Sequence, residues 1–233
     1  MQVFATTDLT AASYSVTLFG LTATSVLLLF GTTWVSRAWR VPILLCALAA
    51  MVGVGATYDG RAAWAAIGKT PIVYHYVGWA VSMPLQVIAL YFFANQAGRQ
   101  TIGLFWRLVV VSVLMVFVRY LGEAEFMHAT LAFLIGLVFW LYILGELFFG
   151  HMDEAVSSSL NINMRRGFFW LRLIVTIGWA IYPLGNFLTS FSGFEDTGAL
   201  SVAYNLADFL NRMAFGVVVL AVAVVATAET EHA

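Results

Sequence analysis

Long apolar runs separated by short polar clusters fill almost the whole chain. Each run is long enough for a membrane-spanning helix, which needs about 20 mostly apolar residues. None shows the short, alternating pattern of membrane β-strands. The pattern predicts an all-α membrane protein: a single domain, residues 1–233, forming a bundle of seven transmembrane helices. We place these helices near 9–35, 40–58, 73–95, 101–121, 126–150, 164–190 and 198–228.

The polar connections between these runs differ in length. The segment DGRAAWAAIGKTP, between the second and third runs, is long enough for a small hairpin, whereas GEAEF joins the fourth and fifth runs tightly. The longest polar connection is HMDEAVSSSLNINMRR. The start of the chain is polar and lacks the basic residues that open a signal peptide, so we expect a short external tail.

Composition supports a bilayer as the solvent of this chain. Hydrophobic residues make up 62% and charged residues 10% of the sequence, whereas soluble domains are about one-quarter charged. The net charge of −1 and the lack of a basic run exclude nucleic acid as a partner, because phosphate binding needs clustered cations. We therefore expect an integral membrane protein in contact with lipid.

Basic residues predict how the chain is oriented, since Lys and Arg concentrate on the inner side of a membrane. One side of the predicted bundle carries five of these residues and the other side carries three. This favours an external N-terminus and an internal C-terminus. The inner set is Arg37, Arg40, Arg99, Arg165 and Arg166, and the outer set is Arg61, Lys69 and Arg119.

Neither enzymatic nor metal chemistry is indicated. The single cysteine, Cys46, lies in an apolar run and is expected to pack there. The four histidines are scattered, and no nucleophile–base pair or metal-ligand cluster is recognisable, so we expect no catalytic residue and no metal.

The strongest site signal lies on the last predicted helix. Tyr204, Asp208 and Arg212 recur every four residues, which places them on one face. A charge at the middle of a membrane costs about 2.5 to 3.5 kcal/mol on insertion scales, and such residues usually face the bundle interior. We therefore expect Asp208 and Arg212 to pair inside the bundle.

Two other helices carry comparable stripes. On the third helix the inward stripe comprises His75, Gly78, Trp79, Ser82, Gln86 and Ala89, and on the sixth it comprises Trp179, Tyr182, Pro183 and Asn186. Pro183 removes a backbone donor and is expected to bend its helix. Trp79 and Trp179 are expected to wall one cavity.

These stripes make the chain resemble a known family. YNLADFLNRMAFG resembles the last helix of proteorhodopsins and xanthorhodopsins, which are microbial (type 1) rhodopsins. YHYVGWAVSMPLQ resembles their third helix, WAIYPLG their sixth, and RYLGEAEFM their fourth-to-fifth turn. The resemblance runs in order from Tyr74 to Gly216, while the first two helices match only in hydropathy. It implies a seven-helix bundle in a prokaryotic inner (plasma) membrane, with a retinal pocket between Trp79 and Trp179.

The chain departs from that family at the residues that carry its chemistry. Arg212 stands where the family has the lysine that condenses with retinal, and a guanidinium, with a pKa above about 12, is not the free nucleophile this step needs. Gly78 replaces the aspartate counterion, Ala89 the carboxylate proton donor and His75 an arginine. The only lysine, Lys69, is predicted in an external loop. We therefore expect no covalent cofactor and no proton pumping.

The substitutions are mutually compatible in charge. With the third-helix aspartate and arginine absent, Arg212 remains as the buried cation and Asp208, in the retained counterion position, as the buried anion. A neutral pair limits the desolvation penalty. The pair either takes over the charge role of a chromophore and fixes the pocket, or simply locks helices together.

Other residues also have two interpretations. His75 is either a switch that titrates near neutral pH or a solvated or hydrogen-bonded structural residue at the membrane edge. Trp79, Trp179 and Tyr182 either hold a polyene or simply pack. Gly136 either opens a gap for a carotenoid, as in some xanthorhodopsin-like proteins, or allows close helix packing. We assign no role to four charged residues near helix ends, where hydration is the default: Arg107, Glu123, Glu125 and Glu146.

Three functions stay open. The first hypothesis is a non-pumping module that associates with itself, as the trimers or pentamers of the family imply, or with a partner rhodopsin. The second is a receptor or carrier that holds retinal or another apolar ligand non-covalently. The third, least favoured, is a light-independent channel or transporter that uses the Gln86, Ser82, His75 and Asp208 stripe.

Overall fold

The computed structural model describes residues 7–191 and 198–231, and their regular structure is helical throughout. The elements are α1 (Leu9–Gly31), α2 (Arg37–Ile67), α3 (Val73–Ala97), α4 (Ile102–Glu123), α5 (Ala129–Phe149), α6 (His151–Ser157), α7 (Ile162–Leu173), the π-helical turn η1 (Ile174–Gly178), α8 (Trp179–Phe191) and α9 (Ala199–Glu231).

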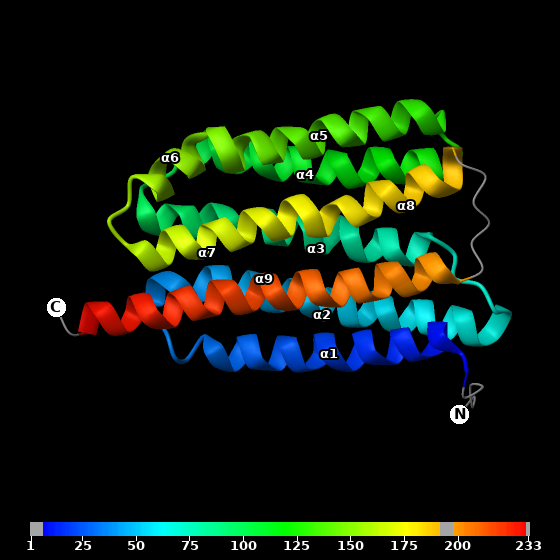
Figure 1. Cartoon of the computed structure of the whole chain (residues 1–233), viewed down its shortest axis with the longest axis horizontal. Coiled ribbons are helices and arrows are strands. Elements are labelled where there is room, and N and C mark those ends of the chain that lie inside the picture. The colour runs from blue at the N-terminus through cyan, green and yellow to red at the C-terminus, as the bar shows by residue number, and fades with distance from the viewer. Residues whose placement is uncertain (1–6, 192–197, 232–233) are drawn as a thin grey trace.

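Seven spans in the described part of the chain are long and apolar enough to cross a membrane. The short α6 continues the span of α5, and α7, η1 and α8 together form the sixth span. The spans lie side by side in one bundle, with the start of α1 and the end of α9 at opposite ends (Figure 1). The predicted seven-helix, all-α membrane fold is confirmed.

Local sequence signals define several helix ends. The Asp8 carboxylate accepts a hydrogen bond from the Ala11 N–H and caps α1, and Thr101 and Asn161 cap α4 and α7 in the same way. Such caps satisfy backbone donors that a helix leaves unpaired. At the end of α2, Gly68 adopts a left-handed conformation, which a glycine tolerates without steric cost.

The second helix is the main correction to the predicted boundaries. The apolar run indicates an end near residue 58, but α2 continues to Ile67, so the first nine residues of the segment expected to form a hairpin are helical. The stretch RAAWAA is rich in alanine, the strongest helix former, so the helix continues where the membrane-like hydropathy stops. With the fifth helix taken as α5 without the short α6, the other six helices begin and end within about four residues of the predicted ranges, as is usual for sequence-based boundaries.

The long polar connection that follows α5 contains a short helix. Its first half forms α6, and Asp153 on α6 accepts a 2.7 Å charged hydrogen bond from Arg172 on α7. The Arg172 guanidinium also lies over the Phe148 and Phe168 rings. This ion pair ties the connection to the sixth span.

The sixth span departs from a regular α-helix about one turn before Pro183, the residue at which a bend is predicted. The helix widens into a π turn at η1, where the Trp179 N–H bonds to the Ile174 carbonyl five residues earlier. Pro183 follows inside α8 and cannot donate to the preceding turn. The irregular turn lies directly before Trp179 and Tyr182 and so helps to set where they enter the interior.

Helix α3 is the most enclosed span. It packs against α2 and α4, while α9 packs against α1 and α2. The polar stripe of α3 therefore faces the middle of the bundle.

Candidate functional site

Asp208 and Arg212 form an ion pair inside the bundle. They lie one turn apart on α9, with Arg212 Nη1 3.0 Å from Asp208 Oδ1. Their side chains are 4% exposed for Arg212 and 10% exposed for Asp208. A pair so enclosed is tolerable only when further hydrogen bonds satisfy its remaining atoms.

Side chains from two other helices supply those bonds to the carboxylate. Trp79 Nε1 on α3 and the Tyr182 hydroxyl on α8 donate to Asp208 Oδ1 at 2.9 and 2.8 Å. His75 Nδ1 lies 3.8 Å from Asp208 Oδ2. The carboxylate thus joins α3, α8 and α9, and the three predicted stripes meet at one point.

The arginine extends away from this aromatic group toward α2 and α3. Arg212 Nη2 donates to Ser82 Oγ at 2.8 Å. A side chain at Gly53 of α2 would come within 3.3 Å of Arg212 Cδ and Nε, so the stem of Arg212 lies in the space that this glycine leaves. The guanidinium is thereby held by Asp208 on one side and Ser82 on the other.

His75 is buried and not solvated, which agrees with a hydrogen-bonded structural residue as well as with a switch. It stacks on Trp79 with ring centroids 5.5 Å apart and meets Tyr204 edge-on. Its place beside Asp208 makes it part of the buried cluster.

The two positions where the resemblance implies a proton relay are enclosed. A β-carbon at Gly78 would lie 2.8 Å from the Ala56 β-carbon, so α2 and α3 approach too closely there for an aspartate in this packing. Ala89 is fully buried in the core, and Gln86, between the two, is buried as well. Neither Gly78 nor Ala89 offers a group that could carry a proton.

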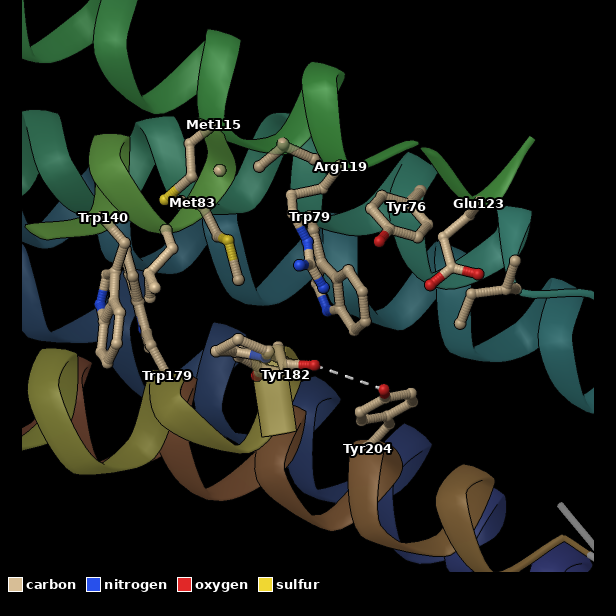
Figure 2. Close-up of a pocket in the computed structure, with 15 residues that line it drawn as sticks. Tyr76, Trp79, Met83, Met115, Arg119, Glu123, Trp140, Trp179, Tyr182 and Tyr204 are labelled. Carbon is tan, nitrogen blue, oxygen red and sulfur yellow. Dashed lines mark hydrogen bonds between the residues drawn. The ribbon is translucent and has the colours of Figure 1, made fainter. Parts of the chain in front are cut away.

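Trp79 and Tyr182, which bind Asp208, also line a separate hollow (Figure 2). It is partly open to the outside, and its non-atom space, open solvent included, is about 590 Å³. Both Trp79 and Trp179 line it, in keeping with the expected two-indole cavity, whereas Arg212 and Asp208 do not. The lining residues are Ile72, Tyr76, Trp79, Met83, Met115, Val116, Arg119, Glu123, Gly136, Leu137, Trp140, Trp179, Tyr182, Pro183 and Tyr204.

The sequence interpretation missed two charged residues of this hollow. Arg119 and Glu123 of α4 both line it, and Glu123 accepts a hydrogen bond from Asn186 of α8. The sequence assigns Glu123 no role, and it uses Arg119 only for orientation and as the start of the RYLGEAEFM turn. Spacing offered a signal, because Met115, Arg119 and Glu123 recur every four residues and share one helix face.

Gly136 on α5 proves to accommodate Arg119. A β-carbon at Gly136 would overlap Cδ and Cγ of Arg119, so the space above this glycine is taken by the arginine stem and not left as a gap for a carotenoid. The Arg119 guanidinium also lies 5.0 Å from the Phe133 ring centroid.

In the described ranges, no three His, Cys, Asp or Glu side chains gather as a metal site would require. Fold and site thus define a class: a seven-helix membrane protein with a buried arginine–aspartate pair next to an aromatic-walled hollow. Residues 8–226 match the family model described as bacteriorhodopsin-like protein, and the chain belongs to this microbial rhodopsin family.

Individual relatives cover nearly the whole chain. A blue-light absorbing proteorhodopsin of Gamma-proteobacterium Hot 75m4 is 31% identical over 219 residues, which are 93% of this chain and 87% of that protein. A green-light absorbing proteorhodopsin of Gamma-proteobacterium EBAC31A08 is also 31% identical, with the same coverage of both chains.

Solved structures agree with this membership. The blue light-absorbing proteorhodopsin from Med12 has a TM-score of 0.78 at 29% identity, covering 93% of this chain and 98% of that one. Xanthorhodopsin, a light-driven ion pump with dual chromophore, has a TM-score of 0.85 at 21% identity, covering 96% and 95%, which supports the fold alone.

Proposed function

We propose that this chain is a lysine-less, non-pumping member of the microbial rhodopsins that holds retinal or another apolar polyene non-covalently. The ligand occupies the hollow between Trp79 and Trp179. Arg212, in the position that the resemblance assigns to the Schiff-base lysine, forms no covalent bond to it.

One observation carries this proposal: the pocket stays open although Arg212 is large. The guanidinium is bound by Asp208 and Ser82, and its stem lies against Gly53, so Arg212 does not line the hollow. The ion pair instead fixes the Trp79 and Tyr182 rings, which hydrogen-bond to Asp208 and separate the pair from the pocket. This geometry favours the role in which the pair replaces the chromophore's charge and shapes the pocket.

The proposed lack of proton pumping rests on the residues at the positions where the family carries its relay groups. Gly78 and Ala89 carry no ionisable group, and Lys69, the only lysine, lies outside the spans between α2 and α3. Neither a retinal linkage nor a relay of the family's kind is available, and no catalytic role is proposed.

Binding of all-trans retinal to the purified protein tests the proposal. Saturable quenching of tryptophan fluorescence is expected, without a visible band that hydroxylamine removes. Trp179→Ala should weaken binding at least roughly tenfold, since burial of a large aromatic side chain is worth about 1.5 kcal/mol or more. Trp106→Ala is the matched control, because Trp106 is 58% exposed and lies outside the hollow.

Two results would overturn the proposal. One is a hydroxylamine-sensitive visible band in the native protein, and the other is quenching that never saturates. Mass spectrometry of an organic extract from a carotenoid-producing host identifies the natural occupant, and lipid alone in the extract counts against a polyene.

Association with itself or with a partner rhodopsin, the leading hypothesis from sequence, is proposed only as an accompanying property. It would place trimers, pentamers or mixed oligomers in the prokaryotic inner membrane, with the N-terminus outside. Native mass spectrometry from nanodiscs is expected to show such an oligomer, and a monomer alone would contradict it. A channel or transporter role is less favoured, because Ser82 and Asp208 are committed to Arg212.

A further inference from the structure

We propose that the occupant of the pocket is an apolar acid, and that its carboxylate binds the Arg119 guanidinium. The inference rests on the proposed non-covalent binding function and specifies the chemistry of the ligand. In the family the retinal aldehyde reacts at the position of Arg212. Here, by contrast, the ligand's polar end is a carboxylate that binds Arg119 on α4.

The position of Arg119 is the first argument. Its stem crosses from α4 over Gly136 on α5, and the side chain contributes to the pocket wall beside Trp79 (Figure 2). An arginine four residues from the end of a membrane helix could extend to the interface and its water. Gly136 instead gives the stem room to lie along the pocket.

The charge around Arg119 is the second argument. Among the described residues no carboxylate lies within ion-pair distance of its guanidinium. Glu123, the nearest acidic residue along the helix, receives a hydrogen bond from Asn186 instead. The face of Phe133 and an interaction with Tyr76 partly satisfy Arg119 without neutralising it. A ligand that closes the pocket without supplying an anion would desolvate this cation at a cost.

The shape of the hollow is the third argument. Trp140 and Trp179 lie toward one end of it and Glu123 toward the other, with Arg119 and Trp79 between them (Figure 2). Met83 and Met115 complete the apolar wall. A molecule with an apolar body and one anionic end matches this division, and an arginine fork binds a carboxylate through two parallel hydrogen bonds.

The charge of Glu123 should weaken the binding of an acid in the pocket. This negative charge lies on the same helix face as Arg119, one turn away, and repels a bound carboxylate. Removal of that charge should therefore strengthen binding of an acid. A neutral ligand of the same shape should be nearly indifferent.

The test compares all-trans-retinoic acid with all-trans-retinol, two polyenes that differ in the end group, by tryptophan quenching in nanodiscs. The acid is expected to bind at least roughly tenfold more tightly. Arg119→Gln should remove this preference by weakening the acid more than the alcohol, while Arg119→Lys should retain part of it. Glu123→Gln should tighten the acid severalfold. Arg107→Gln is the control, since Arg107 lies on the same helix, is exposed and does not line the pocket.

Equal affinity for both polyenes, unchanged by Arg119→Gln, would overturn the carboxylate anchor and leave non-covalent binding intact. Saturable binding of neither polyene would overturn the proposed function and this inference together. Competition by palmitic acid separates the sources of the acid: displacement supports a flexible lipid-derived acid, and its failure supports a rigid polyene acid.

Discussion

Arg212 and Asp208, one turn apart on α9, form a buried ion pair whose atoms also bind Ser82, Trp79 and Tyr182. The pair joins three helices and adds no net charge to the interior. Because aromatic rings lie between it and the hollow, the pair can persist whether or not a ligand is present. In this chain the centre of the bundle is thus a closed structural unit with a binding site beside it.

The charge balance of this unit predicts a large effect of Asp208→Asn on stability. The amide keeps an oxygen that accepts from Trp79 and Tyr182, but it leaves the Arg212 charge unpaired. We expect a loss of about 3 kcal/mol or more in thermal unfolding in detergent. Asp153→Asn, which affects the more exposed pair with Arg172, should cost about 1 kcal/mol or less.

A second substitution checks that explanation. Asp208→Asn combined with Arg212→Leu should recover part of the lost stability, since a buried pair replaced as a whole leaves no unpaired charge. If the double variant is less stable than Asp208→Asn alone, the charge is not the cause.

Arg212→Lys is predicted to restore the chromophore linkage and not the pump. Lysine supplies an amine that can lose its proton and attack retinal, which a guanidinium cannot do. Since the Trp79 and Tyr182 rings lie between position 212 and the hollow, the linkage requires these rings to move aside. The variant with all-trans retinal should show a visible band that hydroxylamine bleaches, and light should drive no pH change, because Gly78 and Ala89 stay without ionisable groups. Arg107→Lys, which adds a lysine at an exposed position, should give no such band. A pumping Arg212→Lys variant would contradict the assignment of the relay positions.

The fold was largely predictable because hydropathy and the spacing of interior residues identify membrane helices in a sequence. Asp208 and Arg212 were expected to pair, and the Trp79 and Trp179 indoles to share a cavity, from helical periodicity alone. The end of α2 was not predictable in the same way. Beyond Tyr58 the chain stops being apolar but keeps strong helix formers, so hydropathy and helix formation end at different residues.

The presence of Arg119 in the pocket wall was not predictable, because it depends on a contact between α4 and α5. Arg119 enters the hollow only because Gly136, on the neighbouring helix, lacks a side chain. Taken alone, each has an ordinary explanation, an interfacial cation and a packing glycine. Likewise, the place of His75 beside Asp208 depends on how α3 faces α9. Such tertiary relations are not contained in the periodicity of one segment.

Gly178→Ala is predicted to disturb the π turn before Trp179. A β-carbon there would lie 2.8 Å from Asn211 Cγ, and the Asn211 amide donates both to the Gly178 carbonyl and to the Tyr182 hydroxyl. Displacement of this amide should cost about 1–3 kcal/mol in thermal stability. Gly145→Ala on α5, where no atom lies within 4 Å of the added carbon, should change stability by less than about 1 kcal/mol. Equal effects of the two substitutions would show that helix propensity, and not the Asn211 contact, is responsible.

Asp8 is predicted to make the N-terminal end of α1 sensitive to acid. The N–H of Ala11 and then the Trp64 indole donate to its carboxylate, and these bonds lower the pKa of Asp8. Since the pKa is lower in the folded protein, the contribution of Asp8 is present at neutral pH and is lost as the pH falls through the lowered pKa, below about pH 4. Asp8→Ala should therefore cost about 1 kcal/mol at pH 7, the usual loss for an N-cap, and the gap to the native protein in thermal unfolding should narrow at low pH. Asp59→Ala, at an exposed carboxylate on α2, should show neither effect. An Asp8→Ala deficit that stays constant from pH 7 to pH 3 would mean that the charge of Asp8 does not contribute.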